Sequence, residues 1–379
     1  MFNKHDLTRD EYMLKGKFAK KGYDWWWHSF TAINEKTKEP KPFYIEFFVC
    51  NPARGKDYPI FGQSKENQEK GIFPSYLMVN VGFWCPRVGG VKGQLHRFFG
   101  INEIDIHKKA PYSIKADDCY IDEEKTYGKV YVSKEDIEKH PEYMSDSGEL
   151  SWNLNIKKII PFNVGYGAGR LFRNLKAFEM FWHAEGMKSK YSGEIVLNGE
   201  KYIVSPDISY GYADKNWGRD FTSPWVWLSS CNLESMISGK KLDNSVFDIG
   251  GGRPKIGFIA LKRKLLSAFY YEGKCYEFNF SKFWTNTRTS FYSKETDEEI
   301  IWHVEQKTWR NKMITDIRCK KEDMILINYE APNGKKLHNH LWNGGNGYGV
   351  VKLYHKNILI DEVKCSNVGC EYGEYDKVK

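Results

Sequence analysis

The chain has 379 residues, of which 41% are hydrophobic and 16% aromatic, and its formal net charge is +8. This length is enough for two domains, and the apolar content supplies a sizeable core. Basic and acidic residues are interleaved, and no zinc-finger or RNA-binding signature occurs. The charge therefore indicates a solvated surface, and we expect no nucleic-acid partner.

The N-terminus and the cysteines bear on the compartment. Residues 1–12 are polar and lack the apolar stretch of a secretory signal. The eight cysteines include no Cys-x-x-Cys pair, which argues against a zinc ribbon or redox dithiol and favours free thiols in a reducing compartment. No apolar run is long enough for a transmembrane helix. We therefore expect a cytoplasmic protein without an integral membrane segment; transient contact with a membrane surface and the oligomeric state stay open.

Helical signals are few along the chain. A weak capping box of the form Thr-x-x-Glu starts at Thr8, and a Ser-x-x-Asp box starts at Ser133. The second box predicts a short helix that must end before Pro141. Residues 171–180 are compatible with a further short helical turn.

Elsewhere, short apolar or alternating runs are separated by turn residues. Residues 195–204 predict a strand, a two-residue turn at Asn198 and Gly199, and a second strand. Similar breaks occur at residues 271–274 and 331–335. This spacing predicts an all-β chain of antiparallel barrels or sandwiches with a few short helices. The many large rings suit strands and can also line apolar pockets.

The two halves of the chain contain similar segments in the same order. The matches are Trp-x-Trp-x-Ser at Trp25 and Trp225, an aromatic strand at Trp152 and Trp302, and a glycine-led strand at Gly193 and Gly349. Three ordered matches favour a duplicated β-domain. We place one domain at residues 1–208 and the other at residues 209–379.

The first aromatic strand carries candidate acid–base residues. Alternation places Asp24, Trp26 and His28 on one face and Trp25 and Trp27 on the other. In a dry interior, Asp24 could orient His28, or either group could donate a proton with a shifted pKa. Structural hydrogen bonds at a barrel end are the alternative.

A second strand, residues 179–185, alternates in the same way. It places His183 and Glu185 on one face as a candidate acid–base pair, with Trp182 on the opposite face. An ordinary strand with a wet polar face is the alternative.

The third candidate is the loop-like stretch 210–221. Loops that collect acids, bases and aromatic rings often carry function, although a clasp between the two halves would explain the same composition. Its candidate residues are Tyr212, Asp214, Lys215, Asn216 and Trp217.

Metal and phosphate sites have weaker support. His338 and His340 could share a strand face, but no cysteine or carboxylate has diagnostic spacing from them. Residues 250–252 are three glycines without a following helical segment, which argues against a phosphate cradle. We therefore expect no metal and no cofactor.

Residues 212–221, followed by an aromatic strand with Trp225 and Trp227, resemble the signature of the tocopherol cyclase family. That signature has an acidic residue, Lys, Asn or Asp, Trp and Gly. The segments around residues 25–28 and 150–202 are similar to the same family. The hydroxyneurosporene synthase, or carotenoid hydratase, group is similar in a looser way.

The resemblance implies two lipocalin-like barrels and cofactor-free acid chemistry on a prenyl-type alkene. Such chemistry needs an acid in a water-poor site and aromatic faces that tolerate a developing cation. The candidate acids are Asp24, His28, His183, Glu185 and Asp214. The candidate substrate-binding residues are Trp25, Trp26, Trp27, Trp182, Tyr212, Lys215, Asn216, Trp217, Trp225 and Trp227.

These residues lead to three hypotheses. The first is a cyclase, hydratase or isomerase that acts on a hydrophobic isoprenoid-type small molecule in an aromatic-lined cavity. The second is a non-catalytic protein that binds lipids or other hydrophobic small molecules. The third is a structural protein whose two barrels pack without a usable pocket.

Overall fold

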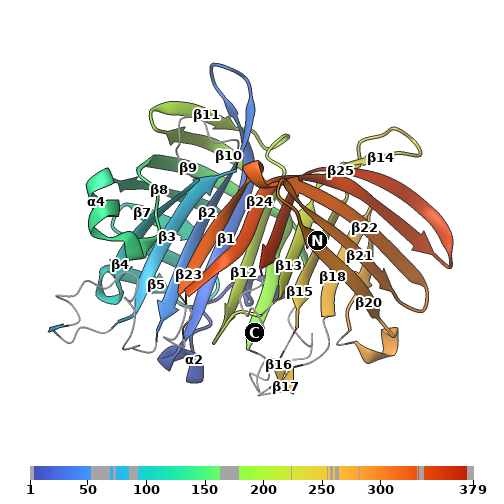
Figure 1. The fold of residues 1–379 in the computed structure, drawn as a ribbon, viewed down its shortest axis with the longest axis horizontal. Coiled ribbons are helices and arrows are strands. Elements are labelled where there is room, and N and C mark those ends of the chain that lie inside the picture. Colours follow the sequence, from blue (N-terminus) through green and yellow to red (C-terminus); the bar gives the residue numbers. More distant parts are fainter. Residues whose placement is uncertain are drawn as a thin grey trace.

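The protein is described here from a computed structural model. The structure describes residues 4–52, 69–70, 74–84, 93–162, 179–222, 224–253, 255–256, 259–260, 264–280, 282–330, 332 and 337–373. These residues form two large, curled, antiparallel β-sheets that lie side by side (Figure 1). The prediction of an all-β chain with two lipocalin-like sheets and a few short helices is confirmed.

The first sheet has twelve strands in the order β4-β3-β2-β1-β11-β10-β9-β8-β7-β6-β5, and β12 pairs with both β1 and β10. Its strands are β1 (Gly22–Asn34), β2 (Pro40–Asn51), β3 (Tyr76–Phe83), β4 (Gln94–Gly100), β5 (Ile104–His107), β6 (Ser113–Ala116), β7 (Cys119–Asp122), β8 (Lys125–Val132), β9 (Gly148–Phe162), β10 (Met180–Leu197), β11 (Glu200–Val204) and β12 (Gly211–Gly218). The sheet curls until β4 reaches β8, where Arg97 donates a hydrogen bond to the Lys129 carbonyl at 2.9 Å.

The second sheet has eleven strands in the order β19-β18-β15-β13-β25-β24-β22-β21-β20, with β14 paired to β25 and β23 paired to β24. Its strands are β13 (Trp225–Ser230), β14 (Asn232–Ser235), β15 (Val246–Gly252), β18 (Lys264–Tyr271), β19 (Lys274–Phe278), β20 (Arg288–Glu295), β21 (Glu299–Lys307), β22 (Asn311–Lys320), β23 (Met324–Glu330), β24 (Leu337–His355) and β25 (Ile358–Gly373). The short strands β16 (Lys255–Ile256) and β17 (Ile259–Ala260) form a separate pair.

The described helices are short. They are the α-helices α1 (Lys4–Leu7), α2 (Lys17–Lys20) and α4 (Lys134–Lys139) and the 3-10 turns Ile101–Glu103, Pro141–Tyr143, Phe283–Thr285 and Lys321–Asp323. None of the described helices is long and apolar enough to cross a bilayer. None of the seven described cysteines forms a disulfide, and the cytoplasmic location stays a prediction.

Of the helix signals predicted from the sequence, only one is confirmed. Ser133 caps α4 through its hydroxyl, and the helix ends before Pro141, as predicted. The capping box at Thr8 was wrong, because residues 8–10 form a turn and no helix starts there. The adjoining segment is instead drawn onto β1, where the Trp26 indole donates a hydrogen bond to the Asp10 carbonyl at 3.0 Å. Of the stretch 171–180, residues 171–178 lie outside the described residues, and β10 begins at Met180.

The predicted hairpins are present. Asn198 and Gly199 adopt positive φ angles of 49° and 83° between β10 and β11, as a tight turn between two strands requires. Glu272 and Gly273 form the same kind of turn between β18 and β19. The break at residues 331–335 lies outside the described residues except for Pro332.

The two sheets share one pattern of connections. In each sheet, the strand with the Trp-x-Trp-x-Ser motif pairs on one side with the next long strand, β1 with β2 and β13 with β15. On its other side lies the second arm of a hairpin, which is β11, followed by β12, in the first sheet and β25 in the second. Gly193 on β10 and Gly349 on β24 occupy equivalent strands. The Trp152 and Trp302 match does not, because β9 pairs with β10 whereas β21 does not pair with β24.

The chain passes from the first sheet to the second at residues 219–224, after β12 and before β13. A domain division between residues 208 and 209 stays a prediction. A division within residues 219–224 would keep both sheets whole, because β12 pairs with β1 and β10.

Glycines bring the two sheets into close contact. A Cβ atom at Gly250 would lie 2.6 Å from the ring of Trp182, and one at Gly345 would lie 2.2 Å from the ring of Trp84. Both tryptophans belong to the first sheet or its loops and are buried. Gly250, from the glycine run 250–252, and Gly345 therefore admit large rings at the contact between the sheets.

Candidate functional site

Strand β1 sends its side chains alternately to two buried regions. Trp26 faces the interior of the first sheet, where it stacks on Tyr112 with ring centroids 5.3 Å apart. Trp25 faces the second sheet and stacks on Tyr329 of β23 at 5.3 Å. The predicted alternation is confirmed, and it separates the candidate residues into an interior group and an interface group.

A cavity lies in the interface group, between the two sheets. Its lining consists of Trp25, Trp27, Asp214, Trp225, Trp227, Tyr329 and Glu371. The volume open to the centre of a water molecule is only about 10 Å³, which is room for about one water. A larger ligand therefore requires these side chains to move apart.

Asp214 of β12 is one of two carboxyl groups in this cavity. Its Oδ2 atom accepts hydrogen bonds from Trp182 Nε1 at 2.8 Å and from the Tyr212 hydroxyl at 3.2 Å. Its Oδ1 atom is buried and accepts no hydrogen bond of normal geometry from the described residues, although the Trp25 indole is close enough to lower the pKa of the group. Burial, with the nearby charge of Glu371, raises the pKa of Asp214 to about 8. The group is therefore mostly protonated at neutral pH.

Glu371 of β25 is the other carboxyl group. It accepts hydrogen bonds from Trp225 Nε1 and from Asn343 Nδ2, both at 2.5 Å. Burial raises the pKa of Glu371 to about 7, although both donors favour the charged form. The two acids of the cavity therefore differ, because both oxygens of Glu371 accept hydrogen bonds whereas one oxygen of Asp214 accepts none of normal geometry from the described residues.

These two acids occupy equivalent positions in the two sheets. Asp214 lies opposite Trp27 in the pairing of β12 with β1, and Glu371 lies opposite Trp227 in the pairing of β25 with β13. The sequence reading missed Glu371. A usable signal was present, since the offset 371 − 214 = 157 nearly equals the offset 349 − 193 = 156 of the glycine-led match.

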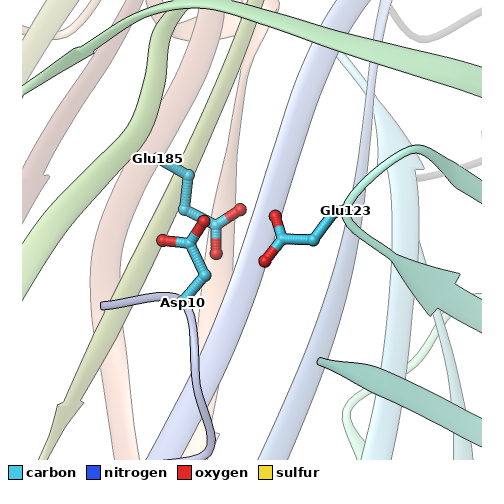
Figure 2. A group of neighbouring side chains, drawn as sticks. All are labelled: Asp10, Glu123 and Glu185. Atoms are coloured by element: carbon cyan, nitrogen blue, oxygen red, sulfur yellow. The ribbon is translucent and has the colours of Figure 1, made fainter. Parts of the chain in front are cut away.

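A second polar group fills the interior of the first sheet (Figure 2). The carboxyl groups of Asp10, Glu123 and Glu185 converge within 4.8 Å of one another. The Lys158 ammonium contacts all three and lies 3.2 Å from Asp10 and 2.6 Å from Glu185. His183 Nε2 lies 3.1 Å from Asp10. Lys158 thus provides the positive charge that a cation would bring to these carboxylates.

The three interior acids do not share one protonation state. Burial raises the pKa of Glu185 well above its usual range, and the charge of Asp10 adds to this effect. Burial also raises the pKa of Glu123 to about 7, against the pull of Lys158. At Asp10 burial is outweighed by Lys158 and His183, so its pKa is lowered. At neutral pH Asp10 is therefore ionised beside Lys158, Glu123 is near the midpoint of its titration, and Glu185 keeps its proton.

Asp24 forms an ion pair with Lys215, and its other oxygen accepts a hydrogen bond from the Met13 backbone at 2.6 Å. The Lys215 ammonium also lies 3.3 Å from the ring centre of Trp26. Burial raises the pKa of Asp24 to about 6. The structure thus pairs Asp24 with Lys215, and Asp24 does not orient His28.

His28 is held by a tyrosine. Its Nδ1 atom lies 2.7 Å from the Tyr191 hydroxyl, which donates to the Tyr212 carbonyl at 2.9 Å. Because that hydroxyl has one hydrogen, Nδ1 of His28 must be the donor in the other bond. Burial lowers the pKa of His28 to about 3, so the ring is neutral.

The stretch 210–221 is not a loop. Residues 211–218 form the buried strand β12, because β1 and β10 pair with its two edges. Alternation then sends its polar residues to both regions. Asn216 accepts a hydrogen bond from the Tyr23 hydroxyl at 2.7 Å, and Trp217 stacks on Phe181 at 5.6 Å.

The candidate residues therefore fall into two sets. The interface holds Trp25, Trp27, Trp182, Tyr212, Asp214, Asn216, Trp225 and Trp227, and the interior of the first sheet holds Asp24, Trp26, His28, His183, Glu185, Lys215 and Trp217. Their catalytic and binding roles stay predictions. The side chains of His338 and His340 lie outside the described part. Sequence reasoning also missed Asp10, Glu123, Lys158 and Tyr329.

The fold and the buried acid pair define a lipocalin-like protein of two equivalent curled sheets with a candidate site between them. Residues 126–373 match the model of the tocopherol cyclase-like family. The chain belongs to this family.

Several solved structures resemble this fold. An AttH-type protein from Nitrosomonas europaea is 12% identical with a TM-score of 0.51, and the match covers 98% of this chain and 96% of that one. CghA with Sch210972 is 11% identical with a TM-score of 0.46, covering 94% and 89%. Kievitone hydratase from Nectria haematococca is 10% identical with a TM-score of 0.43, covering 93% and 90%. At such identities the first likeness concerns the fold alone. No curated protein sequence matches the chain.

Proposed function

We propose that this protein is a cofactor-independent acid catalyst that cyclises, hydrates or isomerises a hydrophobic, isoprenoid-type molecule between its two sheets. One observation carries the proposal. Asp214 is a buried carboxyl group with a raised pKa, it lines an aromatic cavity, and its Oδ1 atom accepts no hydrogen bond of normal geometry from the described residues. A buried polar atom without a partner marks a place where a ligand can bind.

Asp214 is the proposed proton donor. Its protonated form persists at neutral pH, so the acid is ready before the substrate enters. When the proton leaves Oδ1, the hydrogen bonds from Trp182 and Tyr212 to Oδ2 stabilise the carboxylate that forms. These donors are already in place, so little reorganisation accompanies the transfer.

The cavity walls suit a carbocation. Trp25, Trp225, Trp227 and Tyr329 present aromatic rings around the acid pair. The negative faces of such rings attract a cation, most strongly where water is excluded. The cavity holds about one water before a ligand enters, so little water accompanies the substrate to the acid.

Cyclisation, hydration and isomerisation begin with the same proton transfer, and in each the proton gained by the substrate is matched by one released in the second step. An alkene carbon of the substrate gains the proton of Asp214, and the neighbouring carbon becomes cationic. A substrate hydroxyl then closes a ring, a water molecule gives an alcohol, or loss of a neighbouring proton gives an isomeric alkene. Glu371 is the proposed acceptor of the proton released in that second step, because Trp225 and Asn343 favour its ionised form.

A non-catalytic binding protein for hydrophobic molecules is the second candidate. The small cavity and the two hydrogen bonds to Glu371 favour it, because a satisfied carboxylate can be purely structural.

Native mass spectrometry of protein purified from its own host, followed by turnover assays on the co-purified compound, tests both candidates. We expect Asp214→Asn to lower turnover at least about 100-fold, the usual contribution of a positioned acid. Tyr131→Phe, on the exposed face of β8, is the control. If the wild-type protein binds the compound without turning it over, the second candidate is supported and the proposal of an enzyme is wrong.

A further inference from the structure

Exposed apolar side chains are concentrated on one rim of the second sheet. Among the described residues, the exposed large hydrophobic side chains are Tyr127, Tyr131, Ile203, Met236, Ile237, Trp284, Tyr292, Trp309, Tyr348, Ile358 and Leu359. Six of these lie at the turns of one rim, namely Met236, Ile237, Trp284, Trp309, Ile358 and Leu359. Elsewhere on the described surface only Ile203 is not a tyrosine.

Backbone hydrogen bonds join these turns into one continuous edge. The Met236 amide donates to the Glu362 carbonyl at 2.7 Å, which ties the turn after β14 to β25. The Lys356 amide donates a hydrogen bond to the Arg310 carbonyl at 2.6 Å, and the Trp309 amide donates one to the Thr285 carbonyl at 3.3 Å. The ends of β20, β21, β22 and β25 and the turn after β14 lie on the side facing away from the first sheet (Figure 1). We call this edge the apolar rim.

Cations accompany the apolar side chains. The exposed basic residues on the same turns are Lys240, Lys241, Lys307, Arg310 and Lys356, and the exposed acidic ones are Glu234 and Asp243; the neighbouring turn between β18 and β19 adds Lys274 and Glu272. Partial burial and the charges of Lys274, Lys356 and Arg310 together lower the pKa of His355. The apolar rim is therefore basic as well as hydrophobic.

We propose that the apolar rim docks on the surface of a membrane that contains anionic lipids. Tryptophan and aliphatic tips insert at the level of the head groups, as in other interfacial proteins. Lysine and arginine side chains near the surface are each attracted to anionic lipid phosphates. A second copy of the chain is a poorer occupant, since two such rims would bring like charges together.

One end of the β14 turn comes close to a second void, which lies between the sheets. This void is lined by Tyr210, Cys231 and other residues and shares Trp227 with the cavity that holds Asp214. Lys241, at the end of the β14 turn, lies 5.4 Å from the ring of Tyr210. The docking itself does not rest on the proposed function.

Vesicle flotation tests the docking. The full chain is mixed with phosphatidylcholine vesicles with and without phosphatidylglycerol, at low and high salt. We expect binding only to vesicles with phosphatidylglycerol, and weaker binding at high salt. The double variant Trp309→Ser, Ile358→Ser should lower the bound fraction about tenfold. Tyr131→Ser, at a position that is 61% exposed on the first sheet, should bind like the wild type.

Three results would overturn the proposal. The first is wild-type protein that does not bind anionic vesicles, and the second is a double variant that binds them as well as the wild type does. The third is a concentration-dependent dimer, seen by light scattering, that the double variant abolishes, because a second copy would then cover the rim. Circular dichroism of each variant confirms that it folds. A failure of docking leaves the turnover assays for Asp214 unaffected.

Discussion

Asp214 and Asp248, on strands of different sheets, lie on either side of one phenol. The Tyr212 hydroxyl is 3.2 Å from Asp214 Oδ2 and 3.3 Å from Asp248 Oδ2. A phenol has one hydrogen, so it cannot donate to both carboxyl groups at once. Burial raises the pKa of both acids. The carboxyl group that does not accept from the hydroxyl can therefore keep its own proton and donate it to the phenol oxygen. The phenol therefore links the proposed proton donor to the second sheet.

The pH profile of turnover should identify the donor. If Asp214 donates and Glu371 accepts, activity on the co-purified compound rises through about pH 7, where Glu371 ionises, and falls through about pH 8, where Asp214 loses its proton. If Glu371 donates instead, the fall is centred near pH 7. Steady-state rates measured from pH 6 to pH 10 separate the two. A flat profile would mean that neither acid limits the reaction.

Tyr212→Phe should move that profile to higher pH. The hydroxyl favours the ionised form of Asp214, so its removal raises the pKa of Asp214 further. The measurement is the pH at which activity falls. A tyrosine with only a structural role would leave that pH unchanged. Tyr120→Phe, on a half-buried tyrosine bonded to Asp122, is the matched control and should keep the wild-type limb.

Glu46→Gln should flatten the dependence of stability on pH. Burial raises the pKa of Glu46 from 4.5 to about 8, so the folded chain holds a proton that the unfolded chain has lost. That stabilisation is complete below pH 4.5 and disappears as pH rises through about 8. The buried His28 and His96 oppose this slope only while their unfolded forms, with a pKa of 6.5, still carry protons, and they do so equally in the wild type and the variant.

Denaturant unfolding at pH 6.5 and pH 8.5 measures this effect. The free energy of unfolding of the wild type should fall with pH, by up to about 1.4 kcal/mol per pH unit for each such group. The variant should show a smaller fall. An equal slope in both proteins would show that Glu46 is ionised in the fold.

Lys158→Met should destabilise the first sheet. The ammonium is buried against Asp10, Glu123 and Glu185, and its loss leaves buried acids without a counter-charge. A cost of about 3–5 kcal/mol in the free energy of unfolding follows from such cases. Lys190→Met, which removes an exposed pair with Asp207, should change stability by less than about 1 kcal/mol. Equal effects would contradict the charge argument.

Gly250→Ala should loosen the contact between the sheets. The added Cβ would lie 2.6 Å from the buried Trp182 ring, so the indole must shift and its bond to Asp214 must lengthen. Overpacking of this kind costs about 1–3 kcal/mol, and turnover should fall with it. Gly100→Ala is the control, since its nearest neighbour is the flexible Glu103 side chain at 3.1 Å.

The sequence by itself determined the features that depend on neighbouring residues. The two faces of β1 follow from the period-two geometry of a strand, so Trp25 and Trp26 could be assigned to opposite sides. The turn at Asn198 and Gly199 follows from the backbone angles that these residues accept. The repeated Trp-x-Trp-x-Ser motif likewise indicated two similar β-halves, and both halves are present.

Only the tertiary structure decided which residues meet. Lys158 and Asp10 are 148 residues apart and touch because the N-terminal segment enters the first sheet. Asp214 and Glu371 meet because two equivalent strands from different sheets face one cavity. Residues 211–218 form a strand although their polar composition favoured a loop, because β1 and β10 satisfy both backbone edges. Strand pairing and sheet curvature set such contacts, and these depend on the whole chain at once.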